Sequence, residues 1–65
     1  MKFVEILQAI YDTYNVDACY VADNLQIDDD VVLKWETSEL VPSEEELKKF
    51  SELFAIPLKT LQNSL

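Results

Sequence analysis

The stretch from Val21 to Pro42, VADNLQIDDDVVLKWETSELVP, sets the shape of this chain more firmly than any other part. Its apolar residues recur at helical spacing in two short segments, and Gln26 and Ile27 form a tight turn between them. A tryptophan–glutamate pair follows, and the loop after it ends at proline. We therefore expect two short amphipathic helices joined by a turn, with a further helix soon after Pro42.

The rest of the chain is also patterned as helix. Glycine is absent, and both prolines, Pro42 and Pro57, stand where helices would begin. No linker, repeat or low-complexity segment interrupts the pattern. The expected helices run over Lys2–Tyr14, Ala18–Leu25 and Asp29–Thr37, with a fourth after Ser43 and a short fifth that begins near Pro57.

Capping residues mark the boundaries of these helices. Asn15 suits the left-handed conformation that ends a helix. Asp17 and Asp28 are suitable N-caps for the second and third helices. Ser43 is followed three residues later by Glu46, and this spacing predicts a capping box at the start of the fourth helix.

The apolar residues of each expected helix fall on a single face, which predicts one shared core. A chain of 65 residues is a single domain, over residues 1–65, and its small core depends on tight helix packing. The predicted fold is all-α, a compact five-helix bundle. Its expected core consists of Phe3, Ile6, Leu7, Ile10, Tyr14, Val21, Ala22, Leu25, Val32, Trp35, Leu47, Phe50, Leu53, Phe54, Leu58, Leu61 and Leu65.

Composition excludes several classes of protein. Cys19 is the only cysteine and histidine is absent, so we expect no disulfide within the chain, no metal site and no cofactor. One free thiol predicts a reducing, cytoplasmic setting, where we expect Cys19 to be a small packed residue. No run approaches the roughly 20 apolar residues of a membrane span. Without histidine or a glycine-rich loop, we expect no enzyme and no catalytic residues.

The charge is strongly acidic. The chain carries a net charge of −8 from 13 acids and 5 lysines, and it has no arginine. Between Asp17 and Glu46, ten acids face a single lysine, Lys34, which leaves this span with a net charge of −9. Arginine is the usual reader of guanine and a strong phosphate ligand, so the electrostatic signature of a nucleic-acid-binding domain is missing.

The pattern from Val21 onward nevertheless resembles the lambda-repressor-like helix-turn-helix domains of the Cro/cI, or xenobiotic-response-element, type. The matching positions are Val21, Ala22, Leu25, Gln26, Ile27, Val32, Trp35, Glu36, Ser38 and Pro42. The resemblance covers nearly the whole chain and implies a helix-turn-helix fold used in bacterial or phage gene regulation. It makes Ala22, Leu25, Val32, Trp35, Glu36 and Pro42 the structural motif, with Gln26 and Ser38 in place of two family glycines.

The surface that family members turn toward DNA differs here. The first base-reading positions of the third helix correspond to Asp29 and Asp30. Val31 and Leu33 occupy nearby outward positions, where polar residues are usual, and only Lys34 keeps a favourable charge. Carboxylates held near phosphates repel them, by about 1 kcal/mol per pair of unit charges at 4 Å in water and more near a protein surface.

We therefore expect a regulatory protein that acts through protein–protein contacts, as an antirepressor or DNA mimic. Its partner would be a protein, such as a basic DNA-binding regulator, since charge complementarity speeds association. An apolar centre within a charged rim is typical of interfaces. The expected partner-binding residues are Asp29, Asp30, Val31, Leu33 and Lys34.

Other interpretations stay open at this point. The chain is alternatively a sequence-specific DNA-binding regulator of the Cro/cI type, with contacts from Lys34, Lys48 or Lys49. The acids that begin the third and fourth helices also favour the helix dipole, which would explain their positions by helix stability alone. A homodimer through the leucines of the fifth helix is a further possibility, with Val4, Tyr11, Tyr20 and Leu40 as alternative exposed contact points.

Overall fold

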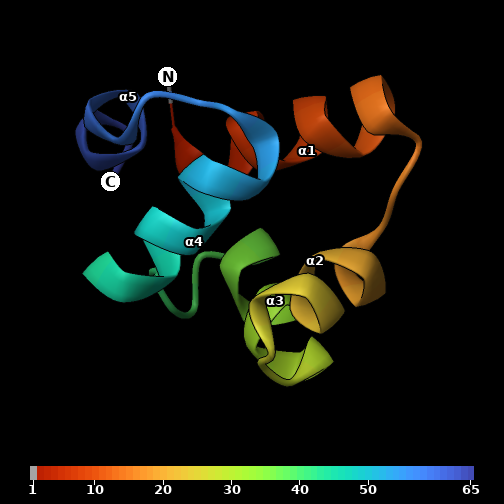
Figure 1. Cartoon of the computed structure of the whole chain (residues 1–65). Helices are drawn as coiled ribbons and strands as arrows, with labels where there is room; N and C mark the ends of the chain where they lie inside the picture. Colours follow the sequence, from red (N-terminus) through yellow and green to blue (C-terminus); the bar gives the residue numbers. More distant parts are fainter. Residues whose placement is uncertain (1) are drawn as a thin grey trace.

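Residues 2–65, which the computed structural model describes, form five helices and no strand (Figure 1). In chain order they are α1 (Phe3–Tyr14), α2 (Ala18–Leu25), α3 (Asp29–Glu36), α4 (Glu44–Phe54) and α5 (Leu58–Asn63). The predicted all-α, five-helix architecture is confirmed. The only differences in the expected bounds are at two ends, since α1 begins one residue later and α3 ends one residue earlier.

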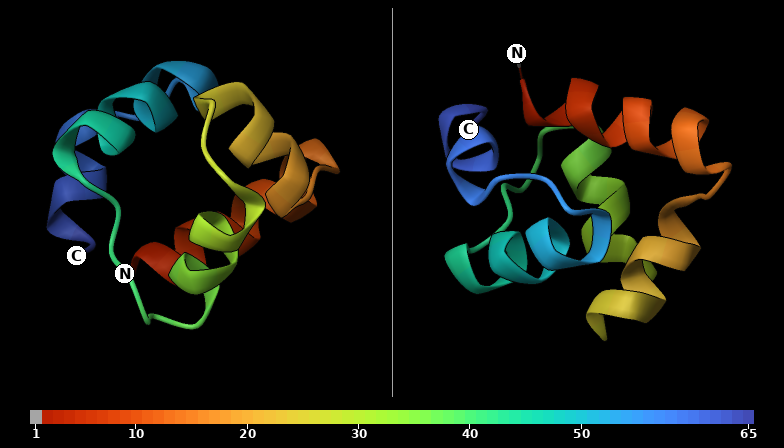
Figure 2. Two further views of the ribbon diagram at one scale, coloured as in Figure 1. Left: turned by 90° about the horizontal axis from the view of Figure 1, so that it is seen from below. Right: turned by 45° about the horizontal axis from the view of Figure 1, so that its top comes forward.

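The helices fold into a compact body of 24 × 24 × 19 Å. α2 packs most extensively against α3, and α4 packs against α5 (Figure 1). The contact of α2 with α4 joins these two pairs, and α1 packs against α3, as the views in Figure 2 illustrate. The backbone N–H of Phe3 donates to the carbonyl oxygen of Ser64 at 3.0 Å, so the start of α1 is tied to the end of α5.

Three of the five helices are followed by a left-handed residue that is not glycine. Asn15, Gln26 and Ala55 are the C-caps of α1, α2 and α4, and their φ angles are 55°, 59° and 54°. Ser38, in the loop after α3, has a φ of 64°. A left-handed conformation costs a residue with a Cβ roughly 1–2 kcal/mol. The tight connections that this conformation makes possible let the short helices pack closely.

The core lies where the inward faces of all five helices meet. It contains Phe3, Ile6, Leu7, Ile10, Ala18, Val21, Ala22, Leu25, Val32, Trp35, Leu47, Phe50, Phe54 and Leu61. Aromatic rings form its centre: the ring centroids of Phe3 and Trp35 are 5.7 Å apart, and those of Phe3 and Phe50 are 5.4 Å apart. Edge and tilted contacts of this kind stabilise cores beyond simple burial.

Two expected core residues lie outside the core. Tyr14 is 52% exposed because it is the last residue of α1, although its ring still packs against Phe54. Leu65 is 55% exposed because it follows the end of α5. Leu53 and Leu58 are half-buried against the core. The remaining residues of the expected core are buried.

Among residues 2–65, no helix combines the length and the apolar character that crossing a bilayer requires.

Candidate functional site

The third helix has a firmly buried inner face. Val32 and Trp35 are 0% and 2% exposed, as their spacing predicts. Ala22 and Leu25 of α2 are buried as well, and so is Pro42 in the loop that leads to α4. These burials fix the rotation of α3 about its axis. They therefore determine which side chains of α3 face solvent.

Four of the five expected partner-binding residues lie on that solvent side. Asp29, Asp30, Leu33 and Lys34 are exposed, with Leu33 at 47%. Val31 differs from expectation, because it is half-buried and packs against the core. The outward face of α3 is therefore defined by Asp29, Asp30, Leu33 and Lys34. It offers one apolar side chain among charges, and Val31 belongs to the scaffold beneath it.

The N-terminus of α3 carries acids that do not cap it with their side chains. Asp28 occupies the N-cap position with extended backbone, but its carboxylate accepts no capping hydrogen bond from the described residues. Asp29 and Asp30 stand in the first turn, where negative charge favours the helix dipole. The prediction of Asp28 as N-cap is thus correct in position only. By contrast, Asp17 accepts a hydrogen bond from the Tyr20 N–H at 3.0 Å.

Cys19 on α2 lies beside the outward face of α3. The thiol is exposed, so the expectation of a packed cysteine is wrong. The charge of Asp29 and a hydrogen bond to it are the main causes that raise the pKa of the Cys19 thiol, with Asp17 and Asp23 adding to the effect. The Cys19 thiol therefore lies close enough to these three carboxylates for their charges to oppose formation of the thiolate.

The C-terminal end of α3 is held by a hydrogen bond. The Tyr11 hydroxyl on α1 donates to Glu36 Oε2 at 2.8 Å. Burial of the phenol is the first cause that raises the Tyr11 pKa above its ordinary value, and the Glu36 bond is the second. Tyr11 is half-buried, so the expectation that it is an exposed contact residue is wrong.

The acids at the start of α4 have a different arrangement. The Ser43 side chain accepts from the Glu46 N–H at 3.2 Å, and the Ser43 N–H donates to Glu46 Oε1 at 2.8 Å. This reciprocal pair is the predicted capping box. Glu44 and Glu45 are exposed beside it. The first turn of α4 is therefore satisfied by its own side chains.

Within residues 2–65, no group of three or more histidines, cysteines or carboxylates has an arrangement that could hold a metal ion. The carboxylates on α3 and α4 are exposed, and the nucleophile Cys19 has a raised pKa. A thiol in that state is a poor nucleophile, because the thiolate is the reactive form. The arrangement is suited to binding by charge and apolar contact.

One buried polar atom lacks a partner. Trp35 Nε1 is shielded from solvent and has no hydrogen-bond acceptor among the described residues. The indole itself fills the core, as the sequence predicts, and Trp35 is 2% exposed. Trp35 also lines a cavity at the edge of the core.

Comparison with known proteins gives no match for this chain, whether to a family model, a curated protein or a solved structure. Burial and charge single out the outward face of α3, where exposed charged residues and an exposed apolar side chain share one side of the helix.

Proposed function

We propose that this chain is a small gene-regulatory domain with a lambda-repressor-like helix-turn-helix scaffold, and that it acts by binding a basic protein. The outward face of α3, formed by Asp29, Asp30, Leu33 and Lys34, is the contact surface. The partner would be a DNA-binding regulator whose basic surface is neutralised, so the domain would work as an antirepressor or DNA mimic.

The packing of α2 and α3 supports the scaffold. α2 is capped by Gln26 in the left-handed conformation, and α3 begins three residues after this cap, at Asp29. The two helices pack on each other through buried Ala22, Leu25 and Val32. A short turn between two packed helices, with the second helix turned outward, is the general form of a helix-turn-helix unit.

The exposed charge on α3 is the observation that carries the proposed activity. Asp29 and Asp30 are solvent-accessible, do not take part in a side-chain cap and lie one helical turn before an exposed apolar residue, Leu33. Interfaces commonly combine an apolar centre with charged groups at the rim. A negative surface also steers a positive partner during diffusional encounter. The outward face of α3 is therefore better suited to bind a basic protein than the phosphate backbone of DNA.

Direct DNA reading by α3 is the competing function. Lys34 is the one basic residue of the α3 face, and the nearest carboxylates on α3 would meet the same phosphates. A protein that binds duplex DNA gains affinity mainly by neutralising phosphates with Lys and Arg. With a net charge of −8 and no arginine, the domain repels the duplex as a whole.

The two acidic helix starts allow a matched test of the protein contact. The probe is a helical peptide with lysines on one side and leucines on the other, titrated at moderate salt while backbone amide resonances are followed. Asp29→Lys/Asp30→Lys should weaken binding at least about tenfold, or about 1.4 kcal/mol. Glu44→Lys/Glu45→Lys makes the same charge change on α4 and should cost much less. Equal losses in both variants would show non-specific charge attraction and remove α3 as the site.

Two further measurements test the proposed role in gene regulation. A native partner isolated with the wild-type domain should be a basic DNA-binding protein, retained by the α4 variant and lost by the α3 variant. Duplex binding is measured by gel shift at low salt with random and operator DNA. Salt-sensitive binding tighter than about 10 µM would favour the DNA-reading function and overturn the proposal.

A further inference from the structure

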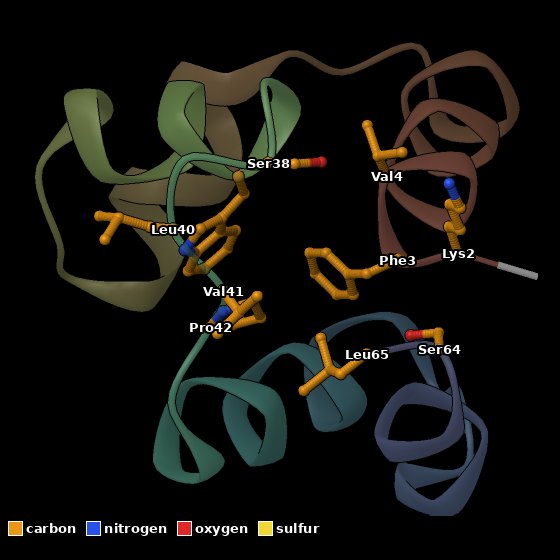
Figure 3. Close-up of a pocket in the computed structure, with 10 residues that line it drawn as sticks. Lys2, Phe3, Val4, Ser38, Leu40, Val41, Pro42, Ser64 and Leu65 are labelled. Atoms are coloured by element: carbon orange, nitrogen blue, oxygen red, sulfur yellow. The ribbon is translucent and has the colours of Figure 1, made fainter.

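The cavity beside Trp35 opens at the surface as a groove of about 260 Å³. One wall is the start of α1, with Lys2 and Phe3, and the opposite wall is the loop from Ser38 to Pro42 (Figure 3). Residues 64 and 65 complete the lining. None of the four residues that form the outward face of α3 lines this groove, so the two surfaces are distinct.

Exposed apolar side chains are concentrated at this groove. Among the described residues, six large hydrophobic side chains are exposed, and three of them, Leu40, Val41 and Leu65, line the groove. Val41 is the most exposed of the six, at 68%. Single exposed apolar residues are ordinary, but several in one place indicate a surface that binds another molecule. The groove is therefore a candidate contact surface.

Backbone hydrogen bonds hold both walls of the groove in place. The N–H groups of Glu39 and Leu40 donate to the carbonyl oxygen of Lys34 at 3.0 and 3.3 Å, which ties the loop to the end of α3. On the other wall, the Phe3 N–H donates to the carbonyl oxygen of Ser64 at 3.0 Å. Because the surface is already ordered, covering it costs little conformational entropy.

The charges at the groove are complementary to each other across it. Lys2 has the only charged side chain in the lining, and apart from the main-chain carboxylate of Leu65 no acid lines it, although the chain has 13 acids. Glu39 is exposed in the loop of the wall opposite Lys2. A two-fold axis through the groove places each wall of one copy against the opposite wall of another. Lys2 of each copy then meets Glu39 of the other.

We propose that a second copy of this chain covers the groove in a two-fold symmetric dimer. Val41 of each copy packs on the groove of the other, and two Lys2–Glu39 pairs flank this apolar centre. A basic protein of the kind proposed for α3 would instead meet Lys2 here and no side-chain carboxylate in the lining. The dimer uses none of the residues proposed for the α3 contact and is independent of it.

Sedimentation equilibrium from about 10 µM to 2 mM protein measures the dimer. A contact limited to one groove is at the small end of interfaces, so we expect a dissociation constant on the order of 100 µM. Val41→Asp places a charge in the apolar centre and should raise the dissociation constant at least about tenfold. Tyr20→Asp changes an exposed residue of α2 in the same way and should alter it less than about twofold. Circular dichroism checks that both variants stay helical.

Glu39→Lys tests the two-fold pairing. It changes the net charge from −8 to −6, so general repulsion between copies would fall and strengthen a dimer. Loss of both Lys2–Glu39 pairs should instead weaken the dimer about threefold or more. Glu52→Lys makes the same charge change at an exposed position on α4 and should not weaken it. Lys2→Glu/Glu39→Lys restores both pairs with reversed signs and should recover the affinity of the wild type.

Three results would overturn this assignment. One is a protein that remains monomeric up to about 2 mM, well above the expected dissociation constant. Another is a dimer that Val41→Asp weakens no more than Tyr20→Asp does, which would place the contact elsewhere. The third is a Glu39→Lys variant that dimerises as tightly as Glu52→Lys, because the two-fold arrangement requires Glu39 to face Lys2 of the other copy.

Discussion

Two helices of this molecule begin in runs of acids, and they use those acids differently. At the start of α4, Ser43 and Glu46 cap each other's backbone N–H groups at 3.2 and 2.8 Å. At the start of α3, Asp28 stands in the N-cap position without a side-chain capping bond. Similar sequences thus give one locally satisfied helix start and one that leaves its carboxylates to solvent.

The difference shows what stabilises each helix. α4 is defined at its first turn by the capping box. α3 is held by its inner face, where Val32 and Trp35 are buried, and by the Tyr11–Glu36 bond at its far end. Favourable interaction with the helix dipole still applies to Asp29 and Asp30, but side-chain capping does not account for them. The acids of α3 are therefore exposed at the surface that we propose as the contact site.

The largest stability effect is expected at the α4 capping box. Ser43→Ala/Glu46→Ala removes both reciprocal bonds and should lower the free energy of unfolding by about 1–2 kcal/mol. Asp28→Ala at the equivalent position of α3 should lower it by only about 0.5 kcal/mol or less, since no capping bond is lost. Urea unfolding followed by circular dichroism measures both. Equal losses would mean that Asp28 caps α3 in solution and would abolish the contrast.

A smaller effect is expected where α3 ends. Tyr11→Phe removes the hydroxyl that Glu36 accepts and should cost about 1 kcal/mol at neutral pH. Tyr20→Phe is the matched control, because Tyr20 is exposed. If the two variants are equally stable, the bond does not hold α3, and the helix depends on its buried face alone.

The same bond makes the stability depend on pH. The folded state raises the pKa of Tyr11 above its ordinary value of 10.0, through burial and then the Glu36 bond. A raised pKa favours the protonated phenol, so its stabilisation is fully present below pH 10 and is lost as the pH rises toward the folded pKa. The difference in unfolding free energy between wild type and Tyr11→Phe should therefore be smaller at pH 11 than at pH 8. The same difference at both pH values would contradict this linkage.

Local chemistry made much of the fold predictable from sequence. Asn15, Asp17 and the Ser43–Glu46 pair define helix ends through contacts within a few residues, and all behave as predicted. Helical spacing likewise identified the buried faces, including Val32 and Trp35. Such features depend on neighbouring residues, so a single sequence contains the information.

Contacts between distant segments were less predictable. The Tyr11–Glu36 bond joins residues 25 apart, and periodicity shows neither the partner nor the burial of the phenol. Val31 has the position of an outward residue, yet its packing depends on where the neighbouring helices lie. The cavity beside Trp35 forms only where the start of α1 and residues 64–65 meet the Ser38–Pro42 loop. None of these arrangements leaves a pattern within one helix.

The smallest predicted effect tests the negative field at the start of α3. Cys19 is exposed, and its raised pKa comes first from Asp29. Because the thiolate is the nucleophile, Asp29→Asn should increase the rate of alkylation by iodoacetamide at pH 7.5 several-fold. Glu44→Gln removes one charge from the α4 start and should leave the rate unchanged, because screened exposed charges act over only about 8 Å at physiological salt.

Mass spectrometry of samples quenched over time gives these alkylation rates. Asp23→Asn should fall between the two variants, since Asp23 contributes to the raised pKa of Cys19 less than Asp29 does. Equal acceleration by the Asp29 and Glu44 variants would mean that the whole acidic surface sets the potential at Cys19. The acids of α3 would then affect the Cys19 thiol no more than those of α4 do. The two helix starts would differ only in the capping box.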